Sequence, residues 1–515
     1  MNSTRTRNNR LYALLFLALF LVRVPFFLTH HVQEDAYISL RCAENLVESG
    51  VYGFNPGERV SSSTSHLYVF LAAAVRLLVG HAAFVPAMLV INTLLFLTGT
   101  GFLARGILRD EKQRLLFWVL ASLLPVSLLI STSGMETSLL IFVIGLSFYL
   151  LSRPNRRGQA FVLIGLFPWV RPDALAYALL LLFWDALRRK RLPWGGMLAL
   201  LLGMGGLLAF NQLYFGTLLQ QSIQAKMLMR HAFSLDEFVR NLGIVFLGSA
   251  DGGIFAPIRT KYLAPAGGLF LLFILTSMIL YLWRVRHDPE QLLSGLTLAS
   301  LALVVPLAYA YGGVLYQWYF WASNLFGYLF ALALITLGIG QHRRMRSVWS
   351  VVVSLFFMAG LLAQGMFSFA WGKKEYAYRG GIGVWLAEHA RPEDRMLLEP
   401  AGYIPYYSGL YTYDEVGLVT PQVVTYRLAY GPRWWPEFVE DFKPQWLVQR
   451  GQIADFTTYQ GYHLSAEEQD WFRLHYDLVA RFAFDPASYT SNAVLERLLT
   501  LGEADNYYLF RYQEK

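Results

Sequence analysis

The strongest constraint on this chain is a series of apolar runs, each long enough or nearly long enough to cross a lipid bilayer as a helix. A segment in lipid must satisfy its own backbone hydrogen bonds, so such runs predict helices rather than open sheet. With 55% hydrophobic residues, the chain is also too apolar for an ordinary soluble domain. We therefore expect a polytopic α-helical membrane protein with eleven transmembrane helices, at 11–29, 83–104, 115–131, 137–152, 158–170, 174–187, 195–215, 264–283, 291–311, 322–340 and 347–369.

The basic residues between these runs predict the orientation, because cytoplasmic connectors are rich in Lys and Arg. With the N-terminus in the cytoplasm, every second connector should be basic. Those connectors are Arg105 to Arg114, Arg153 to Arg157, Arg188 to Arg191, Arg284 to His287, and Arg343 to Arg346. The first run has no small-residue cleavage pattern and is interpreted as a signal anchor. We predict a multi-pass protein of the bacterial inner membrane, whose basic charge reflects topology and contact with membrane lipids, not nucleic acid.

Two segments do not fit a simple spanning helix. Leu67 to Val79 is short and contains Arg76, which favours an interfacial or re-entrant helix over a span. Residues 158–187 hold two short apolar stretches around Arg171, Pro172 and Asp173. Irregular backbone at membrane depth is tolerated where it lines a wet cavity, so this pair predicts a funnel open to the outside.

From residue 373 the apolar runs stop, and short β-like runs at 396–398, 446–449 and 507–512 alternate with helical patterns. We predict a transmembrane domain over 1–372, with a first extracytoplasmic loop at 30–82, and a C-terminal extracytoplasmic α/β domain over 373–515. The latter is dense in aromatic residues, which suit either sugar rings or a small core. They include Tyr403, Tyr406, Tyr407, Tyr411, Tyr413, Trp434 and Trp435.

Adjacent carboxylates follow the first span, at Glu34 and Asp35. Such a pair at a membrane exit can supply a general base or hold a divalent cation such as Mg²⁺ or Mn²⁺. The alternative is that Asp35 only caps the next helix, whose polar side carries Tyr37, Arg41 and Asn45. His30 and His31 (a pair more often interfacial) are candidates to complete a metal site.

Other polar residues on the predicted outer side also have two readings. Glu136 ends a Ser-Gly-Met-Glu run that resembles a capping box, and Asp414 can simply end a strand. Arg171 can pair locally with Asp173, although an ionisable pair at membrane depth favours function. Lys226 can be a lysine that reaches back to the interface. The Pro-Gly pair at 56–57 predicts a turn.

The stretch EDAYISLRCAENLVESGVYGFNPGERVSSSTSHLYVFLAA resembles the first extracytoplasmic loop of GT-C superfamily glycosyltransferases, in particular the branch with the mycobacterial terminal arabinofuranosyltransferases. Further segments match in order: SGMET at 133–137, RPDAL at 171–175, YFGTLLQQSIQAK at 214–226 and DEVGL at 414–418. Two places depart from the family pattern. Ser-Ser-Thr-Ser follows the Gly-Glu turn where the family has Tyr-Thr. Gln-Gln stands before Lys226, within the segment 214–226, where the family has Pro-Asn.

The resemblance implies a polyprenyl-phosphate-linked sugar donor, a glycan, lipid or protein acceptor, and an inverting transfer of a hexose or pentose. It places a catalytic acidic residue, acting as general base, at Asp35, with Glu34 beside it. Arg171, Lys226 and Arg41 become candidates to bind the donor phosphate, because the leaving phosphate needs compensating charge. Supporting roles fall to Tyr37, Glu136, Asp173 and Asp414.

A transporter or flippase of lipid-linked saccharides is the main alternative, since a cavity lined by charged and aromatic residues also serves passage. A phosphoethanolamine transferase would be expected to show a nucleophilic Thr and His/Asp metal ligands in the C-terminal segment. The three histidines there, His389, His463 and His475, show no metal spacing. The acidic pair in the first outer loop, together with the large outer domain, favours an enzyme.

Overall fold

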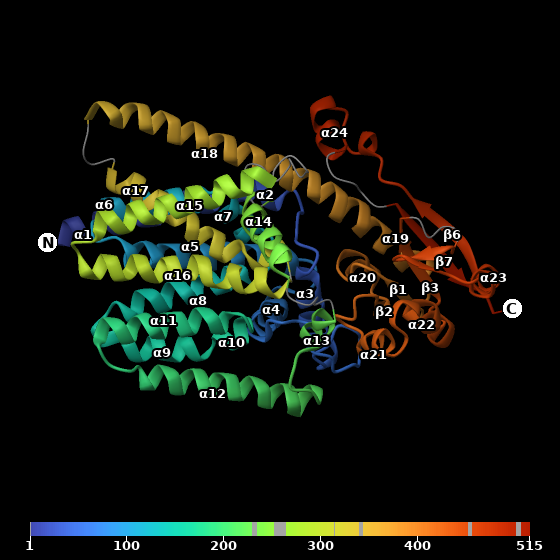
Figure 1. The fold of residues 1–515 in the computed structure, drawn as a ribbon. Helices are drawn as coiled ribbons and strands as arrows, with labels where there is room; N and C mark the ends of the chain where they lie inside the picture. Colours follow the sequence, from blue (N-terminus) through green and yellow to red (C-terminus); the bar gives the residue numbers. More distant parts are fainter. Residues whose placement is uncertain are drawn as a thin grey trace.

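The computed structural model describes residues 2–228, 234–251, 264–313, 315–338, 343–451, 456–500 and 506–514. A helical bundle forms one end of the molecule, and a mixed α/β unit formed by the C-terminal segment covers the other (Figure 1). The N-terminus lies at the end of the bundle away from that unit. The predicted fold class, a polytopic α-helical membrane protein with a C-terminal α/β domain, is confirmed.

The predicted spanning runs are mostly helical where the structure describes them, with breaks at 22–23, 124 and 166. The bundle helices are α1 (Asn2–Leu21), α2 (Val24–Phe27), α3 (Ala36–Ser49), α4 (His66–Val79), α5 (Phe84–Ile107), α6 (Glu111–Leu123), α7 (Pro125–Thr132), α8 (Thr137–Leu151), α9 (Arg157–Gly165), α10 (Phe167–Val170), α11 (Ala174–Arg189), α12 (Trp194–Phe210), α13 (Gln221–Met227), α14 (Leu235–Asp251), α15 (Ala264–Val285), α16 (Pro289–Gly312), α17 (Trp321–Gly338) and α18 (Arg343–Gly372).

Fewer of these helices than predicted are long enough to cross a membrane on their own. Among the described residues, five pass by length and composition, and a sixth does if α6 and α7, which meet at a 69° bend, count as one span. The number of crossings therefore stays a prediction. The end of the run 322–340 and the side chains of Arg343 to Arg346 lie outside the described residues.

The two irregular segments have the predicted local structure. The short run after the serine-rich loop (residues 61–65) forms α4, whose path relative to a membrane stays a prediction. The chain between α10 and α11 breaks at Arg171, where the backbone is extended, with φ −161° and ψ 144°. Pro172 cannot donate a backbone hydrogen bond, and it directly precedes Asp173, the N-cap residue of α11.

The C-terminal unit is a five-stranded mixed sheet in the order β2-β1-β3-β7-β6. Its strands are β1 (Arg395–Leu398), β2 (Tyr411–Asp414), β3 (Trp446–Arg450), β6 (Tyr476–Phe482) and β7 (Tyr507–Tyr512). The three predicted strand runs correspond to β1, β3 and β7, and β2 ends at Asp414. β1 runs parallel to β2 and β3, while β7 is antiparallel to β3 and β6.

Alternation along the strands builds two cores, because successive side chains point to opposite faces. Met396 and Leu398 face one core with Trp446, whereas Leu397 and Leu447 face the other. Tyr403, Tyr413, Trp434 and Trp435 are buried, so for these four aromatics the core interpretation is confirmed. The helices of the unit are α19 (Gly381–His389), α20 (Tyr403–Ser408), α21 (Pro421–Tyr430), α22 (Trp434–Phe442), α23 (Ala466–His475) and α24 (Ala493–Thr500).

The bundle and the C-terminal unit share structure where they meet. α18 continues through a π-helical segment, Lys373–Gly380, directly into α19, so the predicted boundary at 372 falls inside a continuous helix. Ala401, Tyr403, Leu418 and Val419 belong to the hydrophobic core of the bundle. This shared core joins the C-terminal unit to the bundle, where α20 contacts α3.

Candidate active site

Asp35 lies at the start of α3, but its carboxylate does not cap the helix. The residue occupies the N-cap position without any side-chain hydrogen bond to the backbone, so the capping alternative is wrong. The carboxylate lines a small polar pocket of about 30 Å³. The pocket is rich in hydroxyl groups, from Ser39, Ser62, Ser63, Thr64, Ser222 and Tyr319. Asp35 is thus left available for chemistry.

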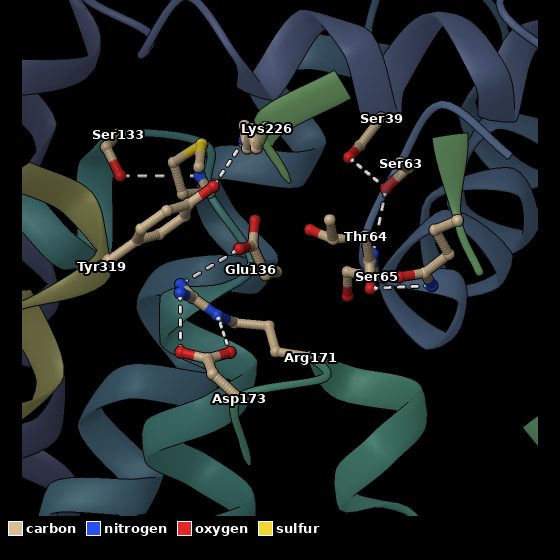
Figure 2. Close-up of polar contacts among 12 residues, drawn as sticks. Ser39, Ser63, Thr64, Ser65, Ser133, Glu136, Arg171, Asp173, Lys226 and Tyr319 are labelled. Atoms are coloured by element: carbon tan, nitrogen blue, oxygen red, sulfur yellow. Dashed lines mark hydrogen bonds and ion pairs between the residues drawn. The ribbon is translucent and has the colours of Figure 1, made fainter. Parts of the chain in front are cut away.

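A cavity of about 420 Å³ adjoins the small pocket. Thr64, Lys226 and Tyr319 line both spaces and so form a common wall between them. Figure 2 shows Lys226 and Tyr319 together above Glu136, with the hydroxyl side chains of Ser39, Ser63 and Thr64 facing them from the serine-rich loop and α3. The remaining lining comes mainly from α11, α13 and α16, and it is largely apolar beyond Arg171 and Asp173.

Arg171 holds two carboxylates at the floor of the site (Figure 2). Its Nε and Nη2 donate to the two oxygens of Asp173 at 2.9 and 3.0 Å, and its Nη1 donates to Glu136 Oε1 at 3.2 Å. The local pair with Asp173 is therefore confirmed. The capping-box reading of Glu136 is wrong, because its carboxylate binds this guanidinium and α8 begins without a side-chain cap.

The charge of this floor matters for ligand binding. One guanidinium faces two carboxylates, so the group formed by Arg171, Glu136 and Asp173 is not a positive site by itself. The cation shared by the cavity and the small pocket is Lys226. An anionic ligand at the common wall would therefore find its compensating charge at Lys226, while Arg171 mainly orders the wall.

Lys226 is held in place by contacts with two tyrosines, Tyr316 and Tyr319. Its ammonium donates to the Tyr319 hydroxyl and lies 5.1 Å from the ring centroids of both Tyr316 and Tyr319. Burial lowers the pKa of Lys226, but the Tyr319 oxygen and the Asp35 carboxylate outweigh it, and the net pKa is raised. The amine is therefore a cation at neutral pH. The snorkelling interpretation does not fit a side chain so enclosed.

The two departures from the family pattern contact each other beneath Lys226. The backbone N–H of Gln221 donates to Ser61 O at 3.1 Å, and Gln220 Nε2 donates to Thr64 O at 3.3 Å. Gln221 Nε2 also donates to Gly417 O at 2.9 Å. The glutamine pair therefore ties α13, which carries Lys226, to the serine-rich loop and to the C-terminal unit.

The environment of Asp35 favours its protonated form. Burial raises the pKa of this carboxyl, Lys226 lowers it, and the carboxylate of Glu399 raises it, with a net upward shift. A carboxylate that is less acidic than usual is a stronger base at neutral pH. Glu399 follows β1, so the C-terminal unit itself contributes to the electrostatics of Asp35.

Glu34 points away from this pocket and joins the C-terminal unit to the first loop. Its Oε1 accepts the backbone N–H of Tyr403 at 3.0 Å, and Oε2 lies 3.5 Å from Arg379 Nη1, which also binds Glu375 at 2.7 Å. Burial and the nearby Glu375 raise the pKa of Glu34. A Cβ at Gly402 would lie 2.3 Å from Glu34 Oε1, so only glycine fits this approach.

Tyr37 and Arg41, on the predicted polar face of α3, are covered by α20. The Tyr37 ring packs on Tyr403 and Tyr406, and its hydroxyl lies 3.1 Å from that of Tyr407. The Arg41 guanidinium donates to the backbone oxygens of Phe54, Pro405 and Leu410. These donors are used within the protein, which argues against the predicted phosphate contact of Arg41.

The Phe-Asn-Pro-Gly-Glu turn docks on strand β2. Asn55 exchanges side-chain hydrogen bonds of 2.9 and 3.0 Å with the backbone of Thr412, and Glu58 Oε1 accepts from the Tyr411 hydroxyl at 2.6 Å. Gly57 has φ +78°, as the predicted turn requires.

Asp414 organises the loop that follows β2. Its carboxylate accepts the backbone N–H groups of Val416, Leu418 and Val419, and it is fully buried. Burial raises the pKa of Asp414 to about 7, against the effect of those hydrogen bonds. This loop carries Leu418 into the wall of the small pocket, so Asp414 acts on the site through the backbone.

The predicted histidine and carboxylate metal cluster does not form. His30 stacks on Tyr376 with ring centroids 4.5 Å apart, and His31 packs edge-on against Phe367. Within the described parts of the chain, no three His, Cys, Asp or Glu side chains gather as metal ligands. Glu34 and Asp35 therefore belong to no such group.

Sequence reasoning missed Tyr319 and Thr64, which complete the common wall. Tyr319 lies in the connector between the predicted spans 291–311 and 322–340, which is predicted to be on the outer side. Tyr316, Trp318 and Tyr319 form a cluster of aromatic residues in that connector. The density of aromatic residues beside a span could have marked Tyr319 as a candidate site residue. Thr64 has no such sequence signal, because a single threonine in a serine-rich loop has no distinguishing spacing.

Comparison with known proteins places the fold. Residues 369–509 match a family model described as a domain of unknown function, DUF8728. No curated protein matches the chain. The crystal structure of ArnT from Cupriavidus metallidurans bound to undecaprenyl phosphate is similar at 12% identity and a TM-score of 0.57, with 97% of each chain covered. The apo form of the same protein is similar at 13% identity and a TM-score of 0.52, covering 86% of this chain and 93% of that one. The chain thus has a GT-C-like membrane fold.

Proposed function

We propose that this protein is a membrane glycosyltransferase that moves a sugar from a polyprenyl-phosphate donor to an extracytoplasmic acceptor with inversion. The observation that carries the proposal is the common wall, where a cation, Lys226, lies between an apolar cavity and a pocket that holds a free carboxylate, Asp35. The similar ArnT structure contains undecaprenyl phosphate, which fits a lipid-linked donor.

In the proposed reaction Asp35 takes the proton from an acceptor hydroxyl as that oxygen attacks the anomeric carbon. The bond between this carbon and the phosphate oxygen breaks, and polyprenyl phosphate leaves with the bonding electrons. Lys226 and the Tyr319 hydroxyl stabilise the charge that develops on the phosphate. The donor sugar and phosphate occupy the 420 Å³ cavity, and the acceptor hydroxyl enters the small pocket.

The finer assignments rest on the sequence resemblance. We propose a relative of the terminal arabinofuranosyltransferase branch, whose sugar is a pentose or a hexose and whose acceptor is a cell-envelope glycan, lipid or protein. The alternating basic connectors support a cytoplasmic N-terminus, and with it a common wall and a C-terminal unit on the outer side of the bacterial cell membrane.

A donor panel tests this function directly. Membranes containing the full-length protein are incubated with radiolabelled polyprenyl-phosphate pentoses and hexoses, and transfer of label to an acceptor fraction is measured. We expect at least one donor to lose its sugar and release polyprenyl phosphate. Saturable donor binding or passage across the bilayer without any release would instead favour the transporter alternative and contradict the proposal.

The rate of transfer should depend on pH through Asp35. Because its pKa is raised, the carboxylate becomes protonated at a higher pH than an ordinary aspartate, whose pKa is about 3.9. The base form is therefore lost as the pH falls through the raised value. We expect the acid limb of the kcat profile above the ordinary aspartate range, with activity recovered on return to neutral pH. A flat profile across this range would contradict the role of Asp35 as base.

A further inference from the structure

A second cavity is lined by residues of α1, α5 and α6. The N-terminus, where α1 begins, lies at the end of the bundle away from the C-terminal unit (Figure 1). The cavity has a volume of about 460 Å³. This is within the range of roughly 300–1,000 Å³ that is usual for pockets holding small ligands. Nothing in the proposed reaction uses it, because the common wall lies near the opposite ends of these helices.

The lining of this cavity is aromatic and apolar. Trp118 forms the back, with the rings of Tyr12 and Phe16 6.1 and 6.2 Å from its own. Its indole N–H donates to Leu97 O at 2.9 Å, which fixes the ring in place. Gly101 leaves space beside it, since a Cβ there would already lie 3.4 Å from Trp118 Nε1. Such a lining suits a hydrocarbon chain.

Two arginines also line the cavity. Arg105 is in the last turn of α5, and Arg114 is near the start of α6. The exposed Arg105 stacks on Tyr12, with Cζ 5.3 Å from the ring centroid, and Arg114 Nε donates to Leu108 O at 2.6 Å. In the described part of the chain neither forms an ion pair. Nearby Arg109, by contrast, is neutralised by Asp288 and Glu290. The cavity therefore combines an apolar lining with two arginines that form no ion pair with any residue in the described ranges.

We propose that this cavity binds an anionic phospholipid, with the phosphate between Arg105 and Arg114 and an acyl chain against Trp118. Basic pockets between transmembrane helices bind acidic head groups in this way. A zwitterionic lipid with the same acyl chains would make the same apolar contacts, but its head group has no net charge to attract the arginines. The site should therefore select lipids by their head group. This site is separate from the common wall and does not depend on the proposed reaction.

The test is native mass spectrometry of the full-length protein with phosphatidylglycerol and phosphatidylcholine of identical chains. We expect preferential retention of phosphatidylglycerol. Replacing both arginines, Arg105→Gln with Arg114→Gln, should weaken its binding about 25-fold, since each basic residue near an anionic lipid accounts for roughly fivefold. Binding of phosphatidylcholine should stay unchanged.

Two further variants decide whether the cavity, rather than surface charge in general, causes the preference for phosphatidylglycerol. Arg286 is a matched control, because it is also exposed and stacks on an aromatic ring, Trp283, at 4.4 Å, outside the cavity. Arg286→Gln should leave the preference intact. Gly101→Leu, which fills the space beside Trp118 but keeps both arginines, should weaken phosphatidylglycerol binding. An equal loss in Arg286→Gln, or no loss in Gly101→Leu, would overturn the proposal.

Discussion

Asp35→Asn should reduce sugar transfer by about 100- to 10,000-fold, the usual contribution of a positioned general base. The asparagine has nearly the same size as the aspartate but cannot accept the proton of the acceptor hydroxyl. Because the carboxylate makes no capping hydrogen bond in the folded protein, the substitution should leave α3 intact. Rates are measured with the donor that the panel identifies, at saturating lipid donor, so that the loss appears in kcat.

Glu48→Gln provides the matched control for this variant. Glu48 is another carboxylate of α3, but it is exposed and pairs with Arg76 at 2.7 Å, away from both the cavity and the pocket. We expect wild-type transfer from this control and unchanged donor binding in Asp35→Asn. Transfer within threefold of wild type in Asp35→Asn would defeat the assignment of the base, whatever the donor.

Lys226→Gln should produce the second large loss, of about 100- to 1,000-fold in kcat/KM, as is typical when one stabilising donor is removed from a developing charge. The KM for the lipid donor should rise, because Lys226 is the cation at the common wall. Removing Lys226 should also change the pH dependence of transfer, through its effect on Asp35. Lys226 lowers the pKa of that carboxyl, so its removal should move the acid limb of the pH profile to higher pH.

Lys373→Gln is the corresponding control, since Lys373 also lies over an aromatic ring, 5.6 Å from the centroid of Phe369, outside both spaces. Lys226→Arg, which keeps the charge, should recover part of the donor affinity. The shift of the pH profile separates the proposed role from a structural one, because a merely loosened α13 would lower activity at every pH. An unshifted profile in Lys226→Gln would refute the coupling to Asp35.

Local patterns predicted much of the secondary structure because they act over short distances. Apolar runs predicted the helices of the bundle, short β-like runs predicted β1, β3 and β7, and the Pro-Gly pair predicted the turn at Gly57. The break at Arg171 and its pairing with Asp173 were also predictable, since both partners lie within one motif. The family-like run around Asp35 singled out the carboxylate, and the structure adds that it is not used as a cap.

Long-range packing decided which of the other candidates share a site with Asp35. Glu34, Tyr37 and Arg41 are neighbours of Asp35 in sequence, yet the C-terminal unit covers α3 and turns all three into contacts with residues more than 300 positions away. Lys226 and Tyr319, far away in sequence, became its partners instead.

The sequence by itself thus determined a membrane helical bundle and a mixed α/β unit, because hydrophobic periodicity and local turns are properties of short segments, and its resemblance to a family singled out Asp35 as the proposed base. Only the tertiary structure decided that Glu136 binds Arg171 and that Lys226 supplies the cation of the common wall. The physical reason is that charge pairing depends on distances between side chains, which are set by how distant elements pack.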